Sequence, residues 1–408
     1  MKKLILLILT SLFTLNIYAQ ELTFSDSIEI SLLTCSPGPE AYAKFGHSGL
    51  RVVDIKNGYD FVFNWGIFSF NTSNFYFKFI KGETDYLLGA QYTADFLAEY
   101  KERNSVVWEH IINLNKAEKK KLIDLILTNY KSENRTYRYN FVYDNCATRP
   151  RDLILGSING HVVFRKNYEA STYRQAIDEY IGGDNWLRFG IDLVFGYQAD
   201  KNMPQLQSMF LPEMLKYEFV NARIYDQQYR NDKPLVKAVN TIVTSKHIEQ
   251  KELEFTERPF YVFLAMLVLI FLISAYELVF DKHYNKFIDS ALLLITGLGG
   301  LLIFFLMFFS VHPLVKFNLN ILWLNPLNII AAILIWFKKY RIQVFFFQLF
   351  NLALVALALI AVAMSVQTFN QATFLVIAIL LFRYSSWIYR AKKRIVRKLK
   401  FQNENKTS

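Results

Sequence analysis

Cysteine and histidine are both scarce in this chain, and their spacing excludes several classes of site. The 408 residues include two cysteines and six scattered histidines, with neither an HExxH nor a CxxC motif. We therefore expect no metal site and no cofactor. Ser48 has no GxSxG context, which disfavours a serine nucleophile. A lipobox cysteine is also absent near the N-terminus, so we expect that the protein is not itself lipidated.

Internal repeats and low-complexity segments are absent as well, and the net charge of +11 is unevenly spread. Much of the positive excess lies in the C-terminal tail, at Arg390, Lys392, Lys393, Arg394, Arg397, Lys398 and Lys400. A basic segment beside membrane spans more often serves topology and anionic lipid headgroups than nucleic acid. We therefore expect no nucleic-acid partner.

The first 19 residues have the pattern of a secretory signal peptide. Lys2 and Lys3 precede an apolar run from Leu4 to Leu15, and the small residue Ala19 favours cleavage before Gln20. The apolar core is short for a membrane span, which argues against a retained anchor. The sequence thus predicts a signal peptide over 1–19 and an exported protein.

The composition changes completely at Phe260, where a series of long apolar runs begins. Each run is near the ~20 residues that a helix needs to cross hydrocarbon. Five transmembrane helices are predicted, over 260–280, 287–311, 319–337, 342–366 and 372–389. The third is the weakest because Asn325, Pro326 and Asn328 interrupt it. The predicted domains are a globular domain over 20–258, a membrane domain over 259–390 and a basic tail over 391–408.

The lysines and arginines of the short loops predict the orientation of these spans. The loop 281–286, the turn 338–341 and the tail are basic, whereas the alternate loops 311–318 and 367–371 contain only Lys316. The C-terminus is therefore expected in the cytoplasm. With an odd number of spans, the globular domain lies on the other side, in agreement with the signal peptide. We expect an inner-membrane protein with a periplasmic domain.

The globular segment mixes strand and helix patterns, which predicts an α+β fold with a small sheet and packed helices. Asn57-Gly58 is a tight-turn signal between two apolar runs and predicts a hairpin. Asn115 followed by Glu118 resembles a capping box at the start of a helix. The expected strands are 28–33, 50–54, 59–65, 106–112 and 137–143, and the expected helices are 115–130 and 151–155.

One histidine and one cysteine of this domain form a candidate catalytic pair. His47 is expected at the start of a strand, and Cys146 just before a helix whose first turn accommodates Pro150. Backbone amides at a helix start give a cysteine thiolate character, and an imidazole can take its proton. A third residue on the neighbouring strand would orient the imidazole, for which Asn64 is the first candidate and Asp60 the second.

Other interpretations of these residues remain open. From composition alone, two cysteines in an exported domain favour a Cys35–Cys146 disulfide, and hence a non-catalytic envelope protein. His47 could instead cap a strand or bond to a carbonyl. A papain-like hydrolase of peptidoglycan or peptides would use the same pair, but it would want a water-filled groove and need no membrane bundle.

Several motifs, taken in order along the chain, resemble the Lnb N-terminal periplasmic domain family. They are Leu33-Thr34-Cys35-Ser36-Pro37-Gly38, Phe45 to Val52, Phe63 to Phe68, Asn74 to Gly82, Tyr143 to Arg149 with Arg151-Asp152, and Met209 to Pro212. The membrane part resembles the same family through Ser310-Val311-His312-Pro313, Asn318-Leu319-Asn320 and Asn325-Pro326-Leu327. The order of histidine before cysteine also resembles permuted papain-like (NlpC-like) acyltransferases.

The resemblance implies a lipoprotein N-acyltransferase that works without a cofactor. Its acyl donor would be a membrane phospholipid and its acceptor the α-amine of a diacylated lipoprotein, with a cysteine thioester between them. The family pattern places the nucleophile at Cys146 and the histidine at His47. Ala147 and Pro150 depart from the Thr and Ile that the motif leads us to expect.

Further polar residues are candidates for binding substrate. Arg149, beside the nucleophile, could help backbone amides to stabilise an oxyanion, and polar side chains at membrane depth often line a pathway. The candidates are Arg149, Asn145, His312, Asn318, Asn320 and Asn325. Hydrogen bonding between helices is the alternative for the membrane residues. The clusters Phe75–Phe79 and Phe210-Leu211-Pro212 could enter the membrane interface or belong to the core.

Overall fold

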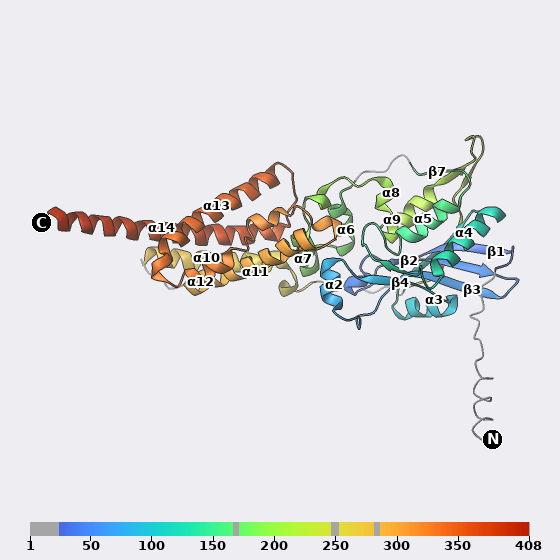
Figure 1. Ribbon diagram of the computed structural model, residues 1–408, viewed down its shortest axis with the longest axis horizontal. Helices are drawn as coiled ribbons and strands as arrows, with labels where there is room; N and C mark the ends of the chain where they lie inside the picture. Colours follow the sequence, from blue (N-terminus) through green and yellow to red (C-terminus); the bar gives the residue numbers. More distant parts are fainter. Residues whose placement is uncertain (1–23, 166–170, 246–252, 281–285, 408) are drawn as a thin grey trace, which may run out of the picture.

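The structure is a computed structural model in which an N-terminal α+β domain is joined end to end with a helical bundle (Figure 1). It describes residues 24–165, 171–245, 253–280 and 286–407. The predicted signal peptide lies outside the described residues. The predicted fold class, an α+β domain followed by a helical membrane region, is confirmed.

A seven-stranded antiparallel sheet forms the centre of the N-terminal domain, in the order β10-β5-β1-β2-β3-β4-β6. Its strands are β1 (Ile28–Cys35), β2 (His47–Asp54), β3 (Tyr59–Ile67), β4 (Asp85–Tyr92), β5 (Val107–Ile112), β6 (Thr136–Arg138) and β10 (Val236–Val243). A second sheet contains β7 (His161–Val163), β8 (Arg223–Tyr225) and β9 (Asp232–Pro234). The main sheet is larger than expected because the sequence did not reveal β4 and β10.

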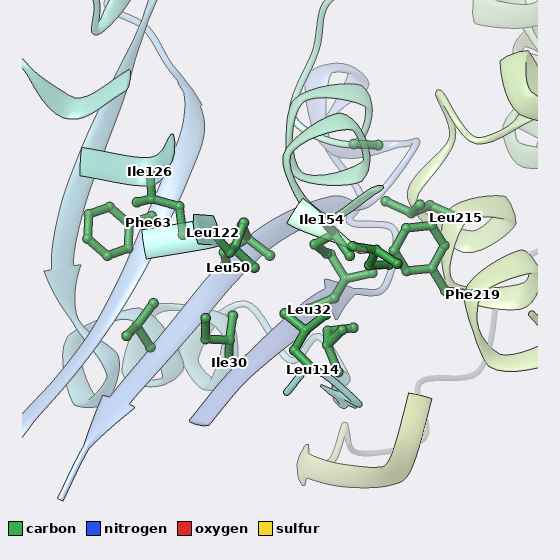
Figure 2. Close-up of a cluster of buried hydrophobic side chains, with 14 of the residues drawn as sticks. Ile30, Leu32, Leu50, Phe63, Leu114, Leu122, Ile126, Ile154, Leu215 and Phe219 are labelled. Atoms are coloured by element: carbon green, nitrogen blue, oxygen red, sulfur yellow. The ribbon is translucent and has the colours of Figure 1, made fainter. Parts of the chain in front are cut away.

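Helices cover both faces of the main sheet. On one face, Ile30 and Leu32 of β1 pack in the core that also contains Leu122, Ile154 and Phe219 (Figure 2). The last three residues belong to helices α4 (Lys116–Tyr130), α5 (Thr148–Ser157) and α9 (Pro212–Asn221), respectively. The other face packs against α3 (Thr93–Glu102). Full burial of each such large side chain stabilises the fold by about 1.5–3 kcal/mol.

The local signals of the sequence were mostly right. The hairpin at Asn57-Gly58 joins β2 to β3. Asn115 and Glu118 form a capping box at the start of α4, in which the side chain of each accepts from the backbone N–H of the other. The strand expected over 137–143 was partly wrong, since β6 ends at Arg138. Beyond it, backbone hydrogen bonds in both directions between Asn140 and Asp144 close a turn that leads to the nucleophile candidate.

Among the described residues, four helices of the bundle are long and apolar enough to cross a membrane. They are α10 (Pro259–Val279), α11 (Lys286–Phe309), α13 (Arg341–Ala363) and α14 (Gln371–Thr407). The third predicted span is not a continuous helix. It contains a 3-10 turn, Leu319–Leu322, then irregular backbone around Pro326 and the short helix α12 (Asn328–Leu334).

This broken segment nevertheless runs antiparallel to α11 along the length of that helix. Lys316 Nζ donates to Met307 O near one end of α11, and Ser290 Oγ donates to Ala332 O near the other. Between them Gly300 has no room for a side chain, because a Cβ would lie 2.0 Å from the Leu324 carbonyl oxygen. Irregular backbone at membrane depth is tolerated when protein surrounds it. The segment therefore lies alongside a candidate membrane helix over its length, where the third span was predicted.

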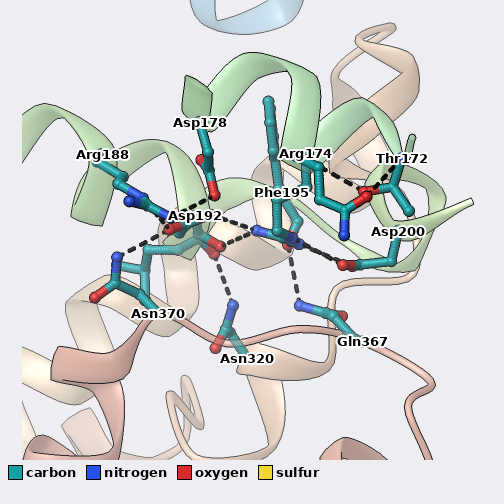
Figure 3. Close-up of polar contacts among 12 residues, drawn as sticks. Thr172, Arg174, Asp178, Arg188, Asp192, Phe195, Asp200, Asn320, Gln367 and Asn370 are labelled. Atoms are coloured by element: carbon teal, nitrogen blue, oxygen red, sulfur yellow. Dashed lines mark hydrogen bonds and ion pairs between the residues drawn. The ribbon is translucent and has the colours of Figure 1, made fainter. Parts of the chain in front are cut away.

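A polar network ties the N-terminal domain to the bundle (Figure 3). Gln367 donates to the Phe195 carbonyl, and Asn370 donates to Asp192. Phe195 follows α7 (Trp186–Val194), which packs beside α6 (Tyr173–Ile181). The bonds fix the domain at the end of the bundle where α11 and α13 finish.

Candidate active site

A tight turn places His47 at the first position of β2. Gly46, just before it, has φ +73°, and a Cβ there would lie 2.5 Å from the Cys35 carbonyl oxygen. Only glycine avoids both the strained dihedral and the clash. His47 then pairs with Cys35 across the β1–β2 ladder, at the end of the sheet.

Asn64 on β3 reaches the imidazole of His47. Its Oδ1 lies 2.6 Å from His47 Nε2, and because a carbonyl oxygen only accepts, Nε2 donates. The bond leaves Nδ1 to face the thiol. Asp60, the second candidate for this role, is instead held by Arg51, whose Nη2 lies 2.7 Å from its Oδ2. The structure thus brings Asn64, and not Asp60, to the histidine.

Cys146 lies immediately before α5, in a turn that the side chain of Asn145 organises. Asn145 Oδ1 accepts from the backbone N–H groups of Ala147 and Thr148, at 2.8 and 2.9 Å. Its Nδ2 donates to the carbonyls of Phe141 and Phe210. Asn145 is therefore fully engaged in shaping the turn, and Pro150 falls in the first turn of the helix, where no N–H is required.

A bulge in β3 makes room for the pair. The β3–β4 register shifts between Trp65 and Ile67, so that Gly66 is the extra residue, with φ +102°. A Cβ on Gly66 would lie 3.6 Å from both Cys146 Cβ and His47 Cε1. Bulges commonly aim side chains at active sites. The glycine keeps the approach to the two reactive groups open.

The two groups shift each other's protonation. Burial acts to raise the pKa of the Cys146 thiol, but the charge of His47 and hydrogen bonds from His47 and from the Ser48 and Cys146 N–H groups outweigh it and lower the pKa. Burial likewise acts to lower the pKa of His47, and the charge and hydrogen bond of Cys146 reverse this and raise it. Opposite shifts of this kind favour a thiolate–imidazolium pair.

Cys35 has the opposite environment. It is fully buried, and burial raises the pKa of its thiol, although a hydrogen bond with Tyr100 acts the other way. Both cysteines are free thiols in the structure. The Cys35–Cys146 disulfide of the non-catalytic interpretation is therefore not formed.

A cavity of about 400 Å³ opens beside Cys146 and His47. Several aromatic residues line it, among them Tyr42, Phe68, Tyr86 and Tyr139. Sequence reasoning missed these residues and the bulge glycine. The available signals were the density of aromatics around β3 and a glycine that interrupts a strand pattern.

The other predicted binding residues lie away from this cavity wall. Arg149 is held by Asp144, at 2.5 Å, and stacks on the ring of Tyr137. His312 bonds to the Phe79 carbonyl. Asn318 and Asn320 both donate to the Leu193 carbonyl, and Asn325 donates to Asn351 inside the bundle. The hydrogen-bonding alternative accounts for these contacts of the membrane asparagines.

The shifted pKa values predict how Cys146 reacts with iodoacetamide in the purified full-length protein. A lowered thiol pKa means that thiolate is present at lower pH, so the alkylation rate should rise at pH values below those of an ordinary thiol. In His47→Ala the charge and hydrogen bond of the imidazole no longer oppose burial, so the midpoint should move upward. The rate is measured by peptide mass spectrometry in a Cys35→Ala background. An unchanged midpoint in His47→Ala would contradict the ion pair.

Together the groups have the geometry for nucleophilic acyl transfer, with an activated thiol, an oriented base and a cavity partly lined by aromatic rings. A model of the Lnb N-terminal periplasmic domain matches residues 18–179, and a model of the Lnb transmembrane domain matches residues 249–395. No curated protein and no solved structure matches the chain. With both of its parts matched in order, the chain belongs to the Lnb family and is a membrane protein with a periplasmic N-terminal domain.

Proposed function

We propose that this protein is a cysteine-dependent lipoprotein N-acyltransferase. It moves an acyl chain from a membrane phospholipid, through a thioester on Cys146, to the α-amine of the diacylglyceryl-cysteine of a lipoprotein. The main support is the pairing of Cys146 with His47 beside a cavity partly lined by aromatic rings, in a domain fixed to a membrane bundle. The family membership supports the same class of reaction. We place the protein in the inner membrane, with a cytoplasmic C-terminus.

The first half-reaction forms the thioester. The Cys146 thiolate, whose proton His47 has taken, attacks the carbonyl carbon of a phospholipid ester. The tetrahedral intermediate then collapses with cleavage of the bond to the glycerol oxygen. His47 returns its proton to that oxygen, and a lysophospholipid leaves. Asn64 keeps the imidazole in the tautomer that this exchange requires.

The second half-reaction transfers the acyl group to nitrogen. An α-amine has a pKa of about 8, so a substantial fraction is protonated at neutral pH and a nearby base is useful. The neutral amine attacks the thioester carbonyl, His47 takes a proton from the new C–N centre, and the thiolate of Cys146 leaves. The products are an amide and the free enzyme, so no cofactor is consumed.

The developing oxyanion needs a donor that the fold has not already used. The N–H groups of Ala147 and Thr148 are engaged by Asn145, and Arg149 is held by Asp144. The N–H groups of Cys146 and Ser48 both point toward the sulfur. We therefore assign oxyanion stabilisation to these two amides rather than to Arg149.

The proposal predicts a trapped thioester on the full-length protein in phospholipid nanodiscs. Intact-mass spectrometry should show one added acyl chain, located on Cys146 and removed by neutral hydroxylamine. A diacylated lipopeptide with a free α-amine should discharge it into an N-acylated product, and the same lipopeptide with an acetylated amine should not. Absence of any adduct would contradict the proposal. Equally fast discharge by water alone would indicate a hydrolase.

A further inference from the structure

The short helix α2 (Phe75–Lys81) exposes an unusual amount of aromatic surface. Phe75 is buried, but Tyr76 is 73% exposed and Phe77 56%, and Phe79 and Ile80 are also exposed. Left-handed residues, Asn74 at φ 56° and Gly82 at φ 74°, end the helix on both sides. Large apolar side chains that gather on one exposed element usually mark a contact surface.

Helix α2 is attached directly to the end of the membrane helix α11. The N–H of Val311 donates to the Lys81 carbonyl at 2.8 Å, and His312 Nε2 lies 2.8 Å from the Phe79 carbonyl oxygen. The rings of Phe77 and Phe305 are 5.9 Å apart. In Figure 1, α2 lies where the N-terminal domain meets the bundle. Because α2 lies beside the end of a membrane helix, we infer that it lies at the level of the membrane–water interface, where aromatic side chains are enriched.

A series of ring contacts continues from α2 to the catalytic cavity. The ring centroid of Phe75 lies 5.1 Å from that of Phe70 and 5.8 Å from that of Phe68. Tyr42 contacts both Phe68 and Phe70, at 6.2 and 6.3 Å. Phe68 and Tyr42 in turn line the cavity that contains Cys146. Phe70 and Tyr42 are each more than half exposed, so the series is open at the surface at these two residues and is supported from below by the buried Phe75.

We propose that this surface binds an acyl chain of a membrane lipid on its way from the bilayer to Cys146. We name it the aromatic surface, and it consists of Tyr42, Phe68, Phe70, Tyr76, Phe77 and Phe79. It gives the apolar chain a continuous path along which it need not enter water. The inference rests on the proposed function, because that function is what gives a phospholipid acyl donor a reason to reach the thiol.

Two observations favour a lipid over a protein partner as the occupant. The aromatic surface continues without a break onto α11 through Phe77 and Phe305, and α11 is itself exposed to the bilayer at Phe308 and Phe309. The last turn of α2 also carries Lys78, which suits the phosphate level of a membrane, and Lys81, which is paired with Glu83. A lipid can pass from one apolar surface to the other by lateral diffusion.

The test compares two donors for the same thiol in the full-length protein. Phe70→Ser and Phe77→Ser should each lower the rate of Cys146 acylation from phospholipid nanodiscs by about tenfold or more, because each removes a large apolar contact with the chain. Acylation by the water-soluble ester p-nitrophenyl butyrate should change less than about twofold, because it needs no path from the membrane. Phe70→Leu should recover most of the lipid-dependent rate.

Tyr229→Ser provides the matched control, since Tyr229 is as exposed as Phe77 but stacks on His161, away from the cavity wall. It should leave both rates unchanged. A phospholipid with a diazirine on its acyl chain should label α2 and Phe70, a readout independent of turnover. Equal loss with both donors, no loss with either, or labelling confined to the bundle would overturn the inference. If p-nitrophenyl butyrate acylates Cys146 but phospholipid never does in the wild type, the proposed function fails, and the labelling still tests the surface.

Discussion

Replacing Cys146 by serine is expected to lower N-acylation of a lipopeptide by at least about a thousandfold, because the nucleophile and its low pKa are lost together. A serine hydroxyl titrates far above a thiol, so His47 cannot form an ion pair with it. The fold should survive, since the turn is held by the side chain of Asn145 and not by the sulfur. Product formation is followed by mass spectrometry, and circular dichroism checks the fold.

Cys35→Ala serves as the control for this prediction. The Cys35 thiol is fully buried and its pKa is raised by burial, so it is neither accessible nor ionised. Removing it should leave the rate within about threefold, since a small apolar side chain replaces a small apolar one. If Cys35→Ala were inactive and Cys146→Ser active, the nucleophile would be misassigned and the mechanism would have to be rebuilt around Cys35.

The hairpin is the part of the site that sequence reasoning predicted best. Asn57-Gly58 is a strong turn signal, and the short turn 55–58 that contains it fixes the register of β2 against β3. That register alone places Asn64 on the strand beside His47. The choice between Asn64 and Asp60 could not be made in this way, because it depends on Arg51, whose pairing with Asp60 becomes visible only in three dimensions.

The membrane region was predicted in outline but not in detail. Hydropathy predicted five spans because each apolar run has about the length that a helix needs to cross hydrocarbon, and four of them are helices of that length in the structure. It could not show that the third would be a broken segment, since that depends on Gly297 and Gly300 of α11 allowing irregular backbone to approach. Nor could it distinguish a substrate niche from structural bonds at Asn325 and Asn328, whose partners Asn351 and Thr296 come from other helices.

The second large effect is expected at Arg174, which holds together the part of the domain that contacts the bundle. Its guanidinium, almost fully buried, pairs with Asp192 at 2.8 Å and with Asp200 at 2.9 Å (Figure 3). Asp178 lies close by, and burial together with the charge of Asp192 raises its pKa to about 6. Three carboxylates therefore share the positive charges of two arginines, Arg174 and Arg188.

Arg174→Met should accordingly destabilise the N-terminal domain by about 3–5 kcal/mol, because it leaves buried carboxylates without a counter-charge. The free energy of unfolding is measured by urea titration of the full-length protein in detergent, followed by tryptophan fluorescence. Arg174→Lys should lower the free energy of unfolding by less, since lysine keeps the positive charge although it lacks the planar guanidinium that pairs with both Asp192 and Asp200. Arg174→Met combined with Asp192→Asn should recover part of the loss, because the unpaired charge is removed as well.

The same substitution should also loosen the contact between the domain and the bundle. Arg174 donates to the carbonyls of Asp192 and Phe195, and Phe195 in turn accepts from Gln367 of the membrane region. Losing the arginine frees this segment, so hydrogen exchange should accelerate at Gly196 and Tyr197, whose N–H groups bond to the loop that follows α11. Faster exchange there with unchanged exchange in β1 would show that Arg174 fixes the catalytic domain to the membrane. Uniform acceleration throughout the domain would show that it supports only the domain's own fold.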